Sequence, residues 1–173
     1  NTSADGAGVF LYAGEWHEIF HNLAFQGGGP AIIESCSVSD NHASTTGGGI
    51  FCGGGIVRNC TVTDNEAALA GGGVYCYPSG QVVNTIMTLN DAPFGREWHD
   101  AATNCSFRHC CTTPPPPGTG NTIHSPLLAG GYRLRRDSPC IDAGTGTNAP
   151  PMDIDGETRW DDPRHANSPS TVD

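Results

Sequence analysis

His17 and His21 flank Glu18 in the sequence His-Glu-Ile-Phe-His, which matches the zinc-peptidase pattern H-E-x-x-H. On a helix this spacing places two imidazoles on one face for zinc, with the glutamate as general base. Against a metal site, Glu15 puts a charge where such helices are usually apolar, and no third ligand is spaced as in the known families. Residues 15–25 also fit a strand of the repeat described below, so the sequence leaves helix and strand open and favours a packed element without metal.

Asp40 and Asp64 occupy equivalent positions in two neighbouring repeats, and Arg58 lies close by in the sequence. Carboxylates at this spacing could bind calcium or, with an arginine, act on a glycan as β-helix lyases and hydrolases do. The competing interpretation is an exposed Asp-Asn turn whose side chains cap the local backbone. We favour the turn and expect no cofactor, with calcium as the alternative.

Asp153-x-Asp155-Gly156 is similar to a calcium loop, but its glycine comes too early for an EF-hand. The pattern therefore adds little to the calcium hypothesis.

The chain has eight cysteines and no C-x-x-C pair, so a structural zinc site is not indicated. Cys36 and Cys60 stack in consecutive repeats, as do Cys52 and Cys76. Parallel strands point such side chains in the same direction, so free thiols and bridges are about equally expected there. The less regular segment is freer to form bridges, and its disulfide candidates are Cys105, Cys110, Cys111 and Cys140.

The composition excludes some classes of protein. A net charge of −10 without any lysine disfavours nucleic acid as a partner, because phosphates require a basic surface. No apolar run reaches the roughly 20 residues of a transmembrane helix. Eight cysteines in an acidic chain favour an oxidising compartment, extracellular or at the cell surface. The chain opens at Asn1 without Met, which indicates a processed product or a fragment.

The strongest signal is an internal repeat. Residues 36–52 contain the frame C-x-V-x-D-N-x-A-x3-G-G-G-[IV], which recurs 24 positions later in residues 60–76. A third, weaker copy begins at Val82 with a shift of 25. Each copy has two short apolar segments between Gly-rich or Asp-Asn turns, which indicates strands that bury their apolar faces only by stacking.

The repeat predicts an all-β fold, a right-handed parallel β-helix of about four coils with an irregular C-terminal cap. Stacking should produce two ladders: an inward apolar ladder of Val38, Val62 and Met87, and an amide ladder of Asn41, Asn65 and Asn90 at a turn. Alternation along the strand would then point Thr63 outward.

The chain divides into three parts by composition. Residues 1–90 are predicted to form the coils, with an insertion at 13–29. Residues 91–144 are rich in Pro and Cys and should cover the last coil, where an exposed sheet edge would otherwise invite pairing. Residues 145–173 form a tail rich in Pro, Asn and Asp.

The repeated frame resembles the Gly-Gly-Ala/Ile and Asn repeats of polymorphic outer-membrane-protein-like β-helices. The heptapeptide at 138–144, Ser-Pro-Cys-Ile-Asp-Ala-Gly, with the Asp-Ile-Asp-Gly at 153–156 and the Val-Asp at 172–173, resembles the choice-of-anchor Q region of bacterial secreted proteins. The resemblance implies a bacterial secreted β-helix whose anchoring end would continue after Val-Asp.

We expect a non-catalytic extracellular or cell-surface scaffold for adhesion or glycan and matrix binding, a fragment of a larger secreted bacterial protein. Nearly every repeated residue has a structural role, and the expected partner is a polysaccharide or a surface protein. The alternative is a polysaccharide lyase or glycoside hydrolase of β-helix type, with Asp40, Asp64 and Arg58 as candidates. A zinc peptidase is the remote alternative. Oligomeric state is not indicated by the sequence.

Overall fold

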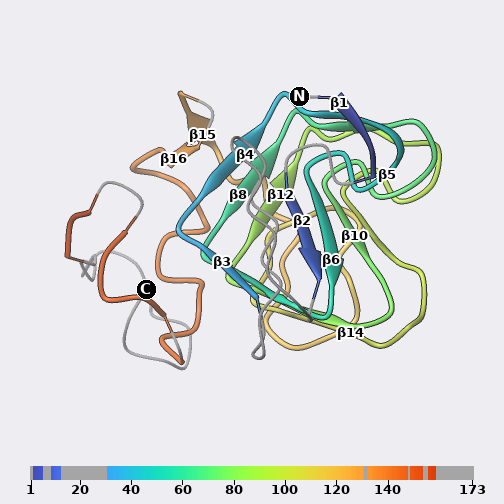
Figure 1. The fold of residues 1–173 in the computed structure, drawn as a ribbon. Helices are drawn as coiled ribbons and strands as arrows, with labels where there is room; N and C mark the ends of the chain where they lie inside the picture. The colour runs from blue at the N-terminus through green and yellow to red at the C-terminus, as the bar shows by residue number, and fades with distance from the viewer. Residues whose placement is uncertain are drawn as a thin grey trace.

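The computed structural model describes residues 2–5, 9–12, 31–130, 132–147, 149–153 and 156–158. These residues form an all-β structure without a helix, in which parallel strands stack as a β-solenoid of about three turns (Figure 1). The predicted parallel β-helix is confirmed, with about three turns in place of about four. Within the described residues there is no helix long and apolar enough to cross a membrane.

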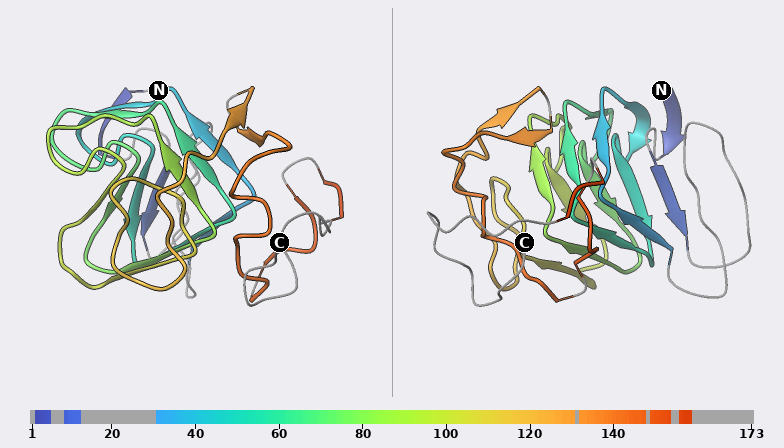
Figure 2. Two further views of the ribbon diagram at one scale, coloured as in Figure 1. Left: turned by 180° about the vertical axis from the view of Figure 1, so that it is seen from behind. Right: turned by 90° about the vertical axis from the view of Figure 1, so that its left-hand side faces the viewer.

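Four parallel sheets run along the solenoid, and each turn contributes strands to them (Figure 2). The first sheet contains, in stacking order, β3 (Ile32–Glu34), β7 (Ile56–Arg58), β11 (Gly80–Val83) and β14 (Cys105–Arg108). The second contains β4 (Ser37–Ser39), β8 (Thr61–Thr63) and β12 (Ile86–Thr88). The third contains β1 (Thr2–Asp5), β5 (His42–Thr46) and β9 (Glu66–Ala67). The fourth contains β2 (Val9–Tyr12), β6 (Ile50–Gly53), β10 (Val74–Cys76) and β13 (Trp98–Asp100).

Consecutive turns pair in the register that the repeat predicts. Val57 pairs with Ile33 on one side and with Val82 on the other. Val9 pairs with Ile50 although residues 13–30 add length between β2 and β3. That added segment, with the predicted insertion at 13–29, lies outside the described residues, and the sheets on either side of it keep their register.

Inward-facing side chains stack into apolar ladders, one for each sheet. The predicted ladder of Val38, Val62 and Met87 is buried as expected. A second buried ladder consists of small residues, Ala43, Ala67 and Ala92. The main core runs through the solenoid and includes Ile33, Ile50, Val57, Val74, Val82 and Phe107.

Thr63 is more buried than the alternation predicts. The threonine is only 1% exposed, and Val62 beside it is buried as well. Thr63 lies between Ser39 and Thr88 in the stack, neither of which is buried, and its hydroxyl donates to the carboxylate of Asp64 at 2.9 Å. The burial is therefore particular to this turn, and the tolerance of Asp at Thr63 stays a prediction.

The predicted asparagine ladder is present and buried. The backbone and side-chain amides of Asn41 both donate to Oδ1 of Asn65, at 3.1 and 2.9 Å. Asn65 makes the same two bonds to Oδ1 of Asn90, at 3.0 and 2.9 Å. Each side chain thus satisfies buried polar groups of the neighbouring turn.

The residue before each asparagine of the ladder turns the chain in the left-handed conformation. Asp40 and Asp64 have φ of 57° and 55°, and Leu89 in the third copy has φ of 61°. Short polar side chains tolerate this conformation better than leucine, which explains the aspartates as turn residues.

The sheets continue past residue 90, the boundary that the repeat suggests. β13 and β14 are parallel members of the fourth and first sheets, so the chain begins a further turn there. Cys111 then forms isolated parallel β-bridges with Ile86 of the second sheet and with Thr122, where the chain returns. Beyond it, β15 (Leu128–Ala129) and β16 (Arg133–Leu134) form an antiparallel hairpin beside the solenoid (Figure 1).

Candidate functional site

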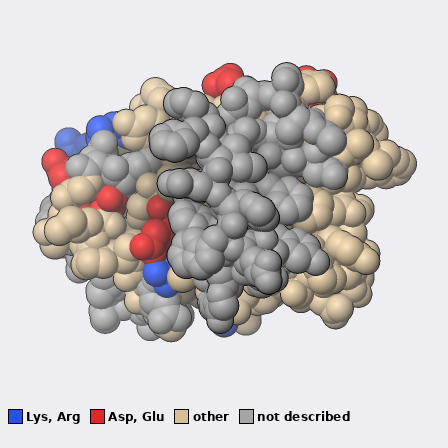
Figure 3. Space-filling model, viewed as in Figure 1, with Lys and Arg blue, Asp and Glu red and all other residues tan. Residues whose placement is uncertain are grey.

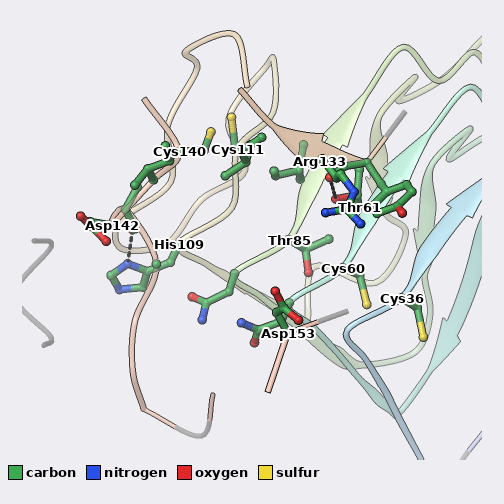
Figure 4. A pocket seen from close by; sticks show the side chains of 18 of the residues that line it. Cys36, Cys60, Thr61, Thr85, His109, Cys111, Arg133, Cys140, Asp142 and Asp153 are labelled. Atoms are coloured by element: carbon green, nitrogen blue, oxygen red, sulfur yellow. Dashed lines mark hydrogen bonds between the residues drawn. The ribbon is translucent and has the colours of Figure 1, made fainter. Parts of the chain in front are cut away.

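A cavity of about 460 Å³ lies between the solenoid and residues 132–147, which we call the C-terminal segment. The solenoid wall consists of residues at the corner between the first and second sheets. The cavity is lined from the solenoid by Asn59, Asn84 and His109, and from the C-terminal segment by Tyr132, Arg133, Cys140 and Asp142. Figure 4 shows the cavity at close range.

The corner between the first and second sheets has the same construction in each turn. Ser35, Asn59, Asn84 and His109 occupy it in left-handed conformation, with φ between 49° and 54°. The next residue of each turn donates its thiol or hydroxyl to a backbone carbonyl two positions earlier, and these residues are Cys36, Cys60, Thr85 and Cys110. Threonine therefore replaces cysteine in one turn with the hydrogen bond retained.

The C-terminal segment binds this corner through backbone groups. The carboxamide of Asn84 donates to the Thr145 carbonyl and accepts from the Thr145 amide, both at 2.8 Å. The imidazole of His109 lies 3.4 Å from the Ala143 carbonyl. At the other end, the hydroxyl of Thr61 donates to the Tyr132 carbonyl at 3.4 Å. Side chains of the corner thus bind the C-terminal segment in addition to the backbone bonds that join the turns.

Asn59 is the equivalent of Asn84 one turn earlier, and it has no such backbone to bind. Its Oδ1 is buried and has no hydrogen-bond partner, although the residue lines the cavity. A buried carbonyl oxygen without a donor costs free energy unless a ligand or water supplies one. Asn59 therefore marks the part of the wall that is prepared to receive a polar group.

Asp142 carries the second unsatisfied group of the cavity. The residue is 2% exposed, and neither carboxylate oxygen has a hydrogen-bond partner in the structure described. The neighbouring turn is well ordered by Ser138, whose hydroxyl donates to the Pro126 carbonyl at 2.6 Å and accepts from the Cys140 amide at 3.1 Å. The heptapeptide at 138–144 therefore builds one wall of the cavity.

Two pairs of thiols line the same cavity. Cys36 lies beside Cys60, and Cys111 lies beside Cys140 (Figure 4). Contact with Cys60 lowers the pKa of the Cys36 thiol from 9.0 to about 7, and the contact together with burial raises the pKa of Cys60. Contact with Cys111 likewise lowers the pKa of Cys140, whereas the pKa of Cys111 is raised.

One disulfide, Cys76–Cys105, is formed among the described residues. It joins β10 to β14. Cys105, one of the four predicted disulfide candidates, is therefore bridged, and its partner Cys76 lies in the repeat. The other three disulfide candidates, Cys110, Cys111 and Cys140, are free thiols here. Cys110 is buried in the core, and burial raises its pKa to about 12.

The candidate acids and arginine of the repeat are not part of the cavity. Arg58 donates from Nε to the Glu34 carboxylate at 2.7 Å, across two adjacent strands of the first sheet. Asp40 and Asp64 occupy the turns before the asparagine ladder, and none of the three residues lines the cavity. Asp40 and Asp64 lie on adjacent turns, where the backbone amide of Asp40 donates to the Asp64 carbonyl at 3.2 Å.

The zinc pattern cannot be placed, because His17, Glu18 and His21 lie outside the described residues. The same is true of Asp155 in the calcium-like loop. In the described remainder of the chain, no group of three or more His, Cys, Asp or Glu side chains could hold a metal ion.

Charged residues of both signs lie near the cavity. Its lining includes Asp142, Asp153 and Glu157, with Arg133 as the basic residue. Arg133 lies over the ring of Tyr132, 5.4 Å from the ring centroid. On the face drawn in Figure 3, basic atoms are visible mainly on the left, next to acidic ones.

Sequence reasoning missed Tyr132, Arg133 and Asn59 as parts of a site. The first two lie in a segment without the repeat, where no period indicates which side chains converge. Asn59 could have been found, because the alignment of Asn59 with Asn84 was already visible. Its role depends on which of the two has a backbone partner, and the sequence does not show that.

Comparison with protein families, with curated proteins and with solved structures finds no match to this chain. The resemblance stated from the sequence therefore stays a prediction.

Proposed function

We propose that the protein is an extracellular, non-catalytic β-solenoid that binds an uncharged, N-acetylated glycan in the cavity beside the C-terminal segment. The observation that carries this proposal is the pair of equivalent asparagines. Asn84 donates to the carbonyl of Thr145 and accepts from its N–H at Oδ1, whereas Asn59 lines the cavity with its Oδ1 unpartnered. An acetamido group on a sugar carries an N–H that can donate to Oδ1 of Asn59, as the Thr145 N–H donates to Oδ1 of Asn84.

The remaining lining suits a sugar. A cavity of about 460 Å³ is within the usual size of small-molecule sites. Tyr132 supplies an aromatic ring and Asp153 and Glu157 supply acceptors for hydroxyl groups. Three carboxylates against one guanidinium disfavour uronic acids and other anionic sugars.

The disulfide Cys76–Cys105 supports an oxidising, extracellular location. A non-catalytic role is supported by Asp40, Asp64 and Arg58, which lie outside the cavity and have local structural contacts.

Calorimetric titration with two matched ligands tests the proposal: β-1,4-linked N-acetylglucosamine oligomers, and β-1,4-linked glucose oligomers of equal length, which lack only the acetamido group. We expect binding of the first and at least tenfold weaker binding of the second. Equal affinities, preferential binding of polyuronate or of an extended peptide, or release of reducing or unsaturated ends would overturn it.

Two variant pairs locate the ligand. Asn59→Gly keeps a residue that tolerates the left-handed turn and removes the carboxamide with its Oδ1 acceptor, so affinity should fall. Asn104→Gly makes the same change at an exposed position outside the cavity and should bind normally. Tyr132→Ala should likewise weaken binding, whereas Tyr77→Ala, at an exposed tyrosine elsewhere, should not.

A further inference from the structure

Cys111 and Cys140 belong to separate parts of the chain and meet at one edge of the cavity (Figure 4). Cys111 is held by the bridges to Ile86 and Thr122, and its thiol donates to the His124 carbonyl at 3.0 Å. Cys140 is held by the hydrogen bond from its amide to the Ser138 hydroxyl. The sulfur atoms of the two thiols lie beside each other in Figure 4, and both residues line the cavity.

We infer that Cys111 and Cys140 form a second disulfide, which fastens the C-terminal segment to the solenoid and fixes the outer wall of the cavity. Both backbones are already anchored on either side of the two thiols, so little chain entropy remains to be lost on closure. The bond would complete the set of contacts that Asn84, His109 and Thr61 make to the same segment.

The pKa values of the two thiols, lowered at Cys140 and raised at Cys111, indicate which thiol reacts first. The lowered pKa makes Cys140 the thiolate that attacks an external low-molecular-weight disulfide, such as oxidised glutathione. The Cys140 sulfur bonds to one sulfur of the reagent, and the other leaves as a thiolate. Cys111 then loses its proton and attacks the Cys140 sulfur, releasing the second thiol. Two electrons pass from the protein dithiol to the reagent, which is reduced to two thiols.

The second thiol pair of the cavity is a useful contrast. Cys36 and Cys60 stack on consecutive turns, which the ladder bonds already join, and each thiol donates to a carbonyl two positions earlier, at 3.2 Å. A bond between them would add no new connection between separate parts of the chain. A bond between Cys111 and Cys140 joins the solenoid to a segment that otherwise contacts it by a few hydrogen bonds.

Peptide mapping without reductant, on the full chain equilibrated with a glutathione redox buffer, tests the bond directly. We expect one cross-linked peptide pair containing Cys111 and Cys140, in addition to Cys76–Cys105. Recovery of both cysteines as alkylated thiols under conditions that oxidise Cys76–Cys105 would overturn the inference, as would Cys140 bridged to any other cysteine.

Hydrogen exchange without reductant tests the effect on the wall. Cys140→Ser should accelerate amide exchange in residues 132–145 at least tenfold and leave β6 to β11 unchanged. Cys36→Ser, which removes a cavity thiol of the other pair, should leave exchange in residues 132–145 as in the parent protein. If amide exchange in residues 132–145 is unchanged in Cys140→Ser, the disulfide does not hold the C-terminal segment to the solenoid, and the inference is wrong. Should that variant fail to fold, Cys111→Ser and the mapping of the parent protein decide the question.

The link to ligand access rests on the proposed function, but the disulfide itself does not. A mapped bond with no glycan binding would refute only the proposed function. Glycan binding with both thiols free would refute only this inference.

Discussion

The carboxylate of Glu97 receives from Asn90 the same two hydrogen bonds that Asn65 receives from Asn41 and that Asn90 receives from Asn65. The backbone amide of Asn90 donates to Oε2 at 3.3 Å, and its side-chain amide donates to the same atom at 2.7 Å. Glu97 thus ends the asparagine ladder, with a charged group in the place of a neutral carboxamide. Burial raises its pKa from the ordinary 4.5 in spite of these hydrogen bonds.

Replacing Glu97 by Gln should therefore stabilise the protein near neutral pH. The folded-state pKa is raised, so the carboxyl contributes stability that is fully present below about pH 4.5 and is lost as pH rises through the folded pKa. Gln keeps an acceptor for Asn90 and has no charge to desolvate. The difference in unfolding free energy between Gln and Glu should be small at pH 4 and grow in favour of Gln toward pH 7.

Denaturant unfolding at several pH values measures this difference. Glu66→Gln, at an exposed glutamate of the third sheet, serves as the control and should show no comparable growth between pH 4 and pH 7. A Glu97→Gln variant that loses stability relative to the parent as pH rises would show that the pKa of Glu97 is not raised in the folded protein.

Removing the middle rung of the ladder should be strongly destabilising. Asn65→Ala leaves the backbone and side-chain amides of Asn41 without their acceptor. It also removes the side-chain donor to Oδ1 of Asn90, which keeps the backbone amide of residue 65. We expect a loss of about 2–4 kcal/mol, from about 1–3 kcal/mol for each buried group left unsatisfied. Thermal or urea unfolding checks the value. Asn104→Ala, at an exposed asparagine, should change stability by less than about 0.5 kcal/mol.

Leu89 offers a stabilising substitution. It is 69% exposed and has φ of 61°, where Asp40 and Asp64 stand in the other two copies. Leu89→Asn should relieve the left-handed strain and stabilise by about 0.5–1 kcal/mol. Leu69→Asn replaces another exposed leucine, one without a positive φ, and should not stabilise. An equal gain in both variants, measured by urea midpoints, would show that the effect comes from surface polarity and not from the turn.

Adjacent isoleucines of β3 test which face is inward. Ile33 is 3% exposed in the main core, and Ile32 beside it is 38% exposed. Ile33→Asp buries a carboxylate without a partner and should prevent folding or cost several kcal/mol. Ile32→Asp should retain the parent's circular dichroism spectrum and most of its stability. Equal tolerance of the two substitutions would mean that the inward face is assigned incorrectly.

The repeat allowed much of the fold to be predicted, because stacking converts sequence spacing directly into register. Val62 and Met87 pair as predicted from a shift of 25, and Asn41 bonds Asn65 from a shift of 24. The burial of Thr63 was not predicted, because alternation along a strand does not show which side chains are covered, and the hydrogen bond of Thr63 to Asp64 is a contact of this turn alone. The solenoid has about three turns where the repeat predicted about four. β13 and β14 extend the fourth and first sheets without the repeated residues, so the repeat does not show where the sheets end.

The cavity could not be predicted from the period. Its solenoid wall repeats, but its outer wall is a single segment whose contacts depend on individual pairs such as Asn84 with Thr145. Cys105 was recognised as a cysteine prone to bridging, but its partner, Cys76, lies in the repeat and was not separable from Cys52 by sequence alone.

The corner between the fourth and first sheets varies in length from turn to turn while the strands on both sides keep their pairing. It comprises residues 54–55 and 77–79 in two turns and 101–104 in a third. Such a corner is a natural acceptor for foreign peptide, because the strands on both sides keep their pairing when its length changes. The solenoid could thus serve as a display framework, in which an epitope grafted at 77–79 is presented at a fixed position on a surface whose neighbouring turns remain undisturbed.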